Sequence, residues 1–138
     1  MKQRPKWLDR WLIALIDGDP WRLEIVLGLY LMLYGGWLLL DINTFASSTT
    51  FAIMAQLGSE EAWGISLIAV SLLLFIAQRR RWKLRLMIVT LSFLQVGFID
   101  SAMWLSGTTS TAPISFLAIE LINAWILISL IGHGNNEH

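Results

Sequence analysis

Apolar residues in this chain gather into four long runs, which short polar or charged segments separate. Each run approaches or exceeds the ~20 residues that an α-helix needs to cross the hydrocarbon core of a bilayer. Because hydrocarbon leaves backbone polar groups no water to bind, such runs are expected to cross as helices. The pattern predicts an all-α integral membrane protein, a four-transmembrane-helix bundle forming one domain over residues 1–138. The predicted spans are residues 21–40, 62–78, 84–105 and 113–131.

A shorter apolar pattern precedes the first span, at residues 6–16. Its tryptophans and leucines share one helical face, while Lys6, Asp9 and Arg10 lie on the other. At about 1.5 Å per residue this segment is too short to cross the bilayer. We expect an amphipathic helix in the cytoplasmic interface, with Lys6 and Arg10 near anionic head groups. The alternative is a simple cytoplasmic lead into the first span.

The connection between the first two spans, residues 41–62, has room for an element of its own. The stretch FAIMAQLG within it predicts a short helix that ends at Gly58. This helix cannot span, so it lies in the interface or covers the outer mouth of the bundle. Ser59 is expected to cap the second span, with Glu60 and Glu61 in the first turn.

Three residues of the first span carry separate expectations. Gly28 and Gly35 lie one heptad apart on one side of the helix, a spacing that permits close contact with a neighbouring helix. Glu24 lies one turn into the span, with Arg22 nearby. We expect Glu24 to act as an N-terminal helix charge at the interface.

Charge is strongly segregated although the formal net charge is zero. All ten lysines and arginines fall within residues 2–22 and 79–85. Basic flanks stay on the cytoplasmic side during insertion, so both termini and the central turn are predicted to be cytoplasmic, in a bacterial inner membrane. The central basic residues are interpreted as topology signals and lipid head-group contacts: Arg79, Arg80, Arg81, Lys83 and Arg85. No nucleic-acid motif accompanies them, so nucleic acid is not expected as a partner.

Composition narrows the chemistry further. Hydrophobic residues make up 56% of the chain and charged residues only 14%, against about 25% charged in soluble domains. Cysteine is absent, which excludes disulfides and thiolate chemistry. His133 and His138 lack a third fixed ligand, so no metal site is predicted. Enzyme and nucleotide motifs are also missing, so we expect a non-enzymatic protein without a cofactor.

Polar side chains nevertheless recur inside the last two spans. Counting about 1.5 Å per residue from the outer ends places Asp100 and Glu120 at similar depth, roughly 8–11 Å below the outer boundary. Gln95 and Asn123 share a second level, roughly 15 Å down. Tyr34 and Ser71 fall at comparable depth in the first two spans. The expected intramembrane polar cluster comprises Asp100, Glu120, Gln95, Asn123, Tyr34 and Ser71.

The negative charges of Asp100 and Glu120 have no evident counter-charge, because no lysine or arginine lies near them in the membrane-embedded part of the predicted spans. An ionised carboxylate there costs several kcal/mol, so at least one acid should be protonated or hold a cation. Three hypotheses follow. The favoured one is a dry set of hydrogen bonds that fixes helix packing. The others are a water-filled pore, in an oligomer, and a proton- or cation-coupled transport site.

One stretch carries a resemblance. NTFASSTTFAIMAQLGSEEAWG, residues 43–64, resembles a segment of small four-helix membrane proteins of phage and prophage genomes. The matching positions are Thr44, Phe45, Ser48, Phe51, Met54, Glu61, Trp63 and Gly64. The resemblance implies a phage-encoded protein of the host membrane and assigns no activity, and four spans depart from the two or three of common holins.

Together these observations predict a small non-enzymatic membrane protein that oligomerises or binds another membrane protein, with a holin-like pore as one form. The alternative is a small proton- or cation-coupled transporter or channel that uses Asp100 and Glu120.

Overall fold

A computed structural model of the chain describes residues 20–40, 43–107 and 111–135. These residues are helical with connecting turns, and they contain no strand. The four long helices are α2 (Trp21–Leu38), α5 (Glu60–Ala77), α6 (Trp82–Leu105) and α7 (Ala112–Asn135). The all-helical prediction is confirmed for this part of the chain. The amphipathic helix predicted at residues 6–16 lies outside the described residues.

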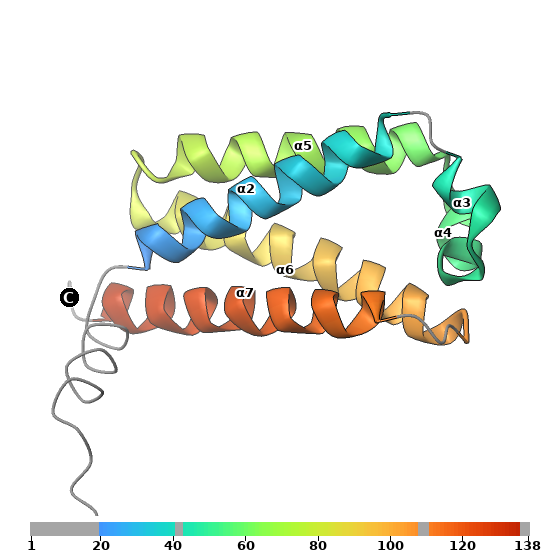
Figure 1. Cartoon of the computed structure of the whole chain (residues 1–138). Coiled ribbons are helices and arrows are strands. Elements are labelled where there is room, and N and C mark those ends of the chain that lie inside the picture. Colours follow the sequence, from blue (N-terminus) through green and yellow to red (C-terminus); the bar gives the residue numbers. More distant parts are fainter. Residues whose placement is uncertain (1–19, 41–42, 108–110, 136–138) are drawn as a thin grey trace, which may run out of the picture.

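The long helices form two pairs, α2 along α5 and α6 along α7, and the pairs stack on each other (Figure 1). The start of α2, the α5–α6 turn and the end of α7 lie at one end of the bundle. The short helices, the end of α6 and the start of α7 lie at the other end. Following the predicted topology, we name these the inner end and the outer end.

Three of the long helices are long and apolar enough to cross a membrane. They are α5, α6 and the part of α7 from Ala112 to Gly132. Helix α2 is as long as α5, at 18 residues. Its first turn contains the charged residues Arg22 and Glu24, which lower its mean hydropathy. The described residues thus show an apolar helical protein with three candidate spans, and they do not confirm the fourth.

The contact between α2 and α5 brings two backbones together. A Cβ atom added to Gly35 would lie 2.7 Å from the carbonyl oxygen of Gly64, and one added to Gly64 would lie 2.8 Å from that of Gly35. A Cβ at Gly28 would lie 2.9 Å from the ring of Phe75. Ser71 donates a buried hydrogen bond of 2.7 Å to the Gly28 carbonyl. Glycine therefore sets the separation of this pair.

Short helices close the outer end in place of the single predicted one. They are α3 (Thr44–Ser47), the 3-10 turn η1 (Thr49–Phe51) and α4 (Ala52–Leu57). The first backbone N–H groups of a helix have no partner within the helix. At the start of α3 the Glu60 carboxylate supplies one, accepting hydrogen bonds from the N–H groups of Thr44 (3.1 Å) and Phe45 (3.3 Å). Ser59 caps α5 by accepting the Ala62 N–H at 3.2 Å.

Helix α4 packs onto α6 and closes the core from the outer end. Met54 is fully buried, and its carbonyl oxygen accepts a hydrogen bond of 3.1 Å from the Trp63 indole nitrogen. Large apolar side chains are exposed on all four long helices, as on Leu33 of α2 (74%) and Leu121 of α7 (64%). The fully buried core side chains include Leu27, Leu31, Leu67, Val96, Ile99 and Ile126. An apolar core inside an apolar outer surface is the arrangement that a lipid environment favours.

Replacing Gly35 by leucine should destabilise the bundle, because its side chain would meet the α5 backbone at Gly64. Overpacking of this kind costs about 1–3 kcal/mol. The matched control is Gly36→Leu, since a Cβ at Gly36 meets nothing within 4 Å. Denaturant unfolding in mild detergent, followed by tryptophan fluorescence, measures both variants. Equal unfolding midpoints for the two variants would contradict the close contact.

Candidate functional site

The polar residues predicted to form one intramembrane cluster are distributed over several helix contacts. Asn123 of α7 donates a hydrogen bond of 2.9 Å to Ser92 of α6, and both residues are fully buried. Gln95 of α6 turns the other way and donates to Ser66 of α5. The two amides that the sequence placed at one depth therefore join different pairs of helices.

Ser71 and Tyr34 also contact other residues than Asp100 and Glu120. Ser71 belongs to the α2–α5 contact through the Gly28 carbonyl. Tyr34 stacks near Tyr30, with ring centroids 6.3 Å apart, and meets Phe116 of α7 edge-on at 4.8 Å. It lines an open pocket of about 450 Å³ below α3 and η1, and its hydroxyl is buried with no hydrogen-bond partner among the described residues.

Asp100 and Glu120 are the two residues of the predicted cluster that form an acidic pair. Asp100 of α6 is 5% exposed and shares a side-chain hydrogen bond with Trp104, one turn further along. Its Oδ1 atom has no partner among the described residues. Glu120 of α7 lies against Gly97, where an added Cβ would be 2.8 Å from Oε1. The two carboxyl groups are close enough to interact electrostatically.

The two acids differ in burial, since Asp100 is buried and Glu120 lies at the edge of the α6–α7 contact. Glu120 is only partly buried, and its neighbours Leu117 and Leu121 are 41% and 64% exposed. On α6, Trp104 beside the pair is 54% exposed, whereas Phe98 stacks on Trp63 of α5 at 5.7 Å. We call this edge, formed by Asp100, Glu120 and the exposed Leu117, Leu121 and Trp104, the acidic seam. Its Glu120 carboxyl is partly exposed to the surroundings of the bundle, while Asp100 lies buried behind it.

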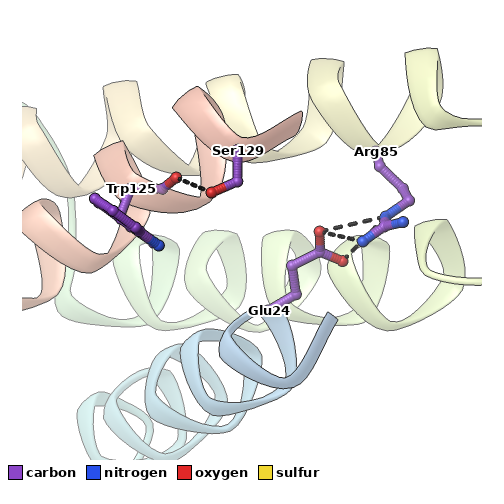
Figure 2. A network of polar contacts seen from close by, with 4 residues as sticks. All are labelled: Glu24, Arg85, Trp125 and Ser129. Atoms are coloured by element: carbon purple, nitrogen blue, oxygen red, sulfur yellow. Dashed lines mark hydrogen bonds and ion pairs between the residues drawn. The ribbon is translucent and has the colours of Figure 1, made fainter. Parts of the chain in front are cut away.

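A second charged contact, between Glu24 and Arg85, joins α2 to α6 at the inner end (Figure 2). Arg85 Nη2 lies 2.8 Å from Glu24 Oε1, and Nε donates to both carboxylate oxygens at 3.3 Å. The side chains are 12% and 1% exposed, respectively. Figure 2 also draws Ser129 of α7, which donates a hydrogen bond of 2.9 Å to the Trp125 carbonyl oxygen of its own helix.

The expectation that Glu24 is an N-terminal helix charge is confirmed by its place in the first turn of α2, but its exposure at the interface needs correction. The side chain is buried and paired with Arg85, while Arg22 packs over the Trp21 ring at 5.5 Å. The sequence contains a signal for this pair. Glu24 lies near the start of the first apolar run and Arg85 near the start of the third, and both starts are predicted to be cytoplasmic. Arg79, Arg80, Arg81 and Lys83 remain exposed around the α5–α6 turn, and Lys6 and Arg10 lie outside the described residues.

Chemically, the acidic seam offers two carboxyl groups and few supporting ligands. In the part of the chain that the structure describes, no group of three or more His, Cys, Asp or Glu residues could hold a metal ion. Two neighbouring carboxyls in hydrocarbon can share a proton, or accept hydrogen bonds from a partner's donors. Association and proton handling are therefore the roles that this geometry permits.

Comparison with known proteins does not assign the chain to a family. No protein-family model matches the chain, and neither the curated proteins nor the solved structures include a match. The functional argument therefore rests on the acidic seam and the charged contact themselves.

Removing one partner of the Glu24–Arg85 pair should destabilise the bundle strongly, because the other charge stays buried. Glu24→Gln and Arg85→Gln should each cost about 3–5 kcal/mol, and the double variant should cost less than their sum. The measurement is a double-mutant cycle of unfolding free energies in detergent.

Arg81→Gln is the matched control for this cycle. Its side chain is exposed at the start of α6, so it should change stability by about 0.5 kcal/mol or less. An Arg85→Gln variant as stable as Arg81→Gln would show that the buried pair does not hold the helices together.

Proposed function

We propose that the protein is a non-enzymatic, four-span inner-membrane protein that acts by oligomerising through its acidic seam. The observation that carries this proposal is a partly exposed carboxyl group, Glu120, among exposed apolar side chains of α6 and α7. In hydrocarbon a polar group that the protein leaves uncovered favours association with a helix that can bind it.

The fourth span of this proposal is α2. Its length equals that of α5, and it packs along α5 through Gly35 and Gly64. The charge that lowers its hydropathy is compensated within the protein, since Glu24 is paired with Arg85. Apolar side chains are exposed along its outer face, with Leu29 at 48% and Leu33 at 74%. These features support a helix in lipid, with both chain ends cytoplasmic.

A second copy is the partner that the seam suits best. A protonated carboxyl group both donates and accepts a hydrogen bond, so a two-fold arrangement could pair the Glu120 side chains of two copies. Leu117 and Leu121 beside Glu120 are exposed and supply apolar contact for such a partner. The sequence resemblance supports a role in the host envelope, in which several seams enclosing water would form a holin-like pore.

One observation favours a different function. Asp100 has an unpartnered carboxylate oxygen close to Glu120, and such a pair can bind and release a proton or a cation. Coupled transport through these two acids is therefore the second candidate.

Single-cysteine cross-linking tests the association directly, because the native chain has no cysteine. Leu121→Cys on the seam should give cross-linked dimers in membranes, whereas Leu33→Cys on α2 should not. Adding Glu120→Leu should reduce the cross-linking, while Glu120→Gln, which keeps a hydrogen-bonding group, should largely preserve it. Equal cross-linking at the two positions would refute association through the seam.

The same variants separate the two candidate functions. In proteoliposomes, transport predicts a pH-dependent flux of protons or cations that Asp100→Asn and Glu120→Gln both abolish. Association predicts that Glu120→Gln still cross-links and that neither variant changes the flux. A flux lost in both variants would replace the association proposal by transport.

A further inference from the structure

An open groove of about 720 Å³ lies at the inner end of the α2–α5 pair, away from the acidic seam. Apolar side chains form one part of it, and the residues that begin the α5–α6 turn form the other. Its lining consists of Ile25, Leu72, Phe75, Ile76, Gln78, Arg79 and Arg80. All seven are uncharged or basic, so the groove has an apolar wall and a cationic end.

We propose that this groove is a binding site for one anionic phospholipid, with the phosphate at Arg79 and Arg80 and an acyl chain along the apolar wall. The site goes beyond oligomerisation and uses none of the residues of the acidic seam. In the proposed topology it opens toward the inner leaflet.

The chemistry of the cationic end selects a phosphate. Arg79 and Arg80 are both exposed and lie side by side in sequence at the end of the groove. Guanidinium groups bind phosphate oxygens through paired, charge-assisted hydrogen bonds. Glu24 of α2, which precedes Ile25 of the groove wall, is paired with Arg85. Gln78 adds an amide nitrogen that is buried and has no hydrogen-bond partner among the described residues.

The apolar wall selects a lipid over a free phosphate ion. Leu72 and Ile76 lie one turn apart on α5 and are 48% and 55% exposed. Both lead from the arginines toward the middle of a candidate span, along the direction in which an acyl chain runs. A free phosphate would use only the cationic end and would leave this wall uncovered.

The shape of the groove is fixed by the packing of Phe75. Its ring lies against Gly28, where a Cβ would approach within 2.9 Å, so the ring rests on the α2 backbone. Ile25, one turn before Gly28, forms the facing wall. The groove is thus a consequence of the glycine-mediated contact between α2 and α5.

Lipid binding can be measured on the full-length protein by native mass spectrometry from mild detergent. The probes are phosphatidylglycerol and phosphatidylcholine with matched acyl chains. The wild type should retain one phosphatidylglycerol molecule in preference to phosphatidylcholine. Arg79→Gln with Arg80→Gln should weaken this binding about tenfold or more, since each basic residue near the head group contributes to attraction.

The matched control is Arg81→Gln with Lys83→Gln, which removes the same charge from the same turn but touches no part of the groove. It should keep most of the phosphatidylglycerol binding. Ile76→Trp, which fills the apolar wall, should also weaken binding, and inorganic phosphate at millimolar concentration should not displace the lipid.

Three results would overturn the proposal. Equal losses in the two double variants would reduce the effect to general attraction by the basic turn. Unchanged binding in Ile76→Trp would remove the acyl chain from the groove. Displacement by inorganic phosphate would identify a free anion as the ligand. Unfolding midpoints, expected to match the wild type for all exposed arginine variants, show that each variant is folded.

Discussion

The buried ion pair between Glu24 and Arg85 is the contact on which the rest of the bundle depends. It joins the start of α2 to the start of α6, across 61 positions of sequence. Either charge alone would be costly in an apolar surrounding, whereas each supplies the hydrogen-bonding partner that the other needs. Because Arg85 compensates the charge of Glu24, α2 can pack along α5 at Gly35 and Gly64. The other face of α2 is apolar and suits lipid. The same contact fixes the inner end, where the basic turn and the proposed lipid groove lie.

Beyond that pair, three contacts between long helices of the described chain each carry a buried or partly buried polar bond. Ser71 binds α2 to α5, Gln95 binds α6 to α5, and Asn123 binds α7 to α6. In a bilayer such bonds fix the relative rotation and height of helices that apolar packing alone would leave free to slide. Asp100 and Glu120 make no such bond between helices among the described residues, where Asp100 keeps an unpartnered oxygen and Glu120 is partly exposed. The proposed function rests on these two acids for that reason.

Much of the architecture could be predicted from sequence, because apolar length and terminal signals act locally. The runs at residues 62–78, 84–105 and 113–131 correspond to α5, α6 and α7, with ends that shift by a few residues. Ser59 caps α5 as its position before Glu60 suggests. Gly28 and Gly35 do lie at a close helix contact, because a glycine spacing of one heptad keeps one face bare along α2.

Partner choice could not be predicted in the same way. Helical periodicity tells which residues share a face, but it does not tell which neighbour that face meets. Gln95 and Asn123 have matched depths yet point to different helices, since α6 contacts both α5 and α7. The sequence places Glu24 at a helix end and Arg85 at lipid head groups, because depth alone does not show that their helices meet. Contacts that depend on helix rotation need a structure.

The central claim is that α2 crosses the membrane despite its charged start. Spin labels at Leu29 and Leu33 of α2, in the protein reconstituted into liposomes, test it through their collision rates with oxygen and with a polar nickel complex. A label at Gln56 on the short helix α4, which is exposed, serves as the reference outside the spans. The account predicts that both α2 labels collide readily with oxygen and are shielded from nickel. Labels on α2 as accessible to nickel as the one at Gln56 would contradict it.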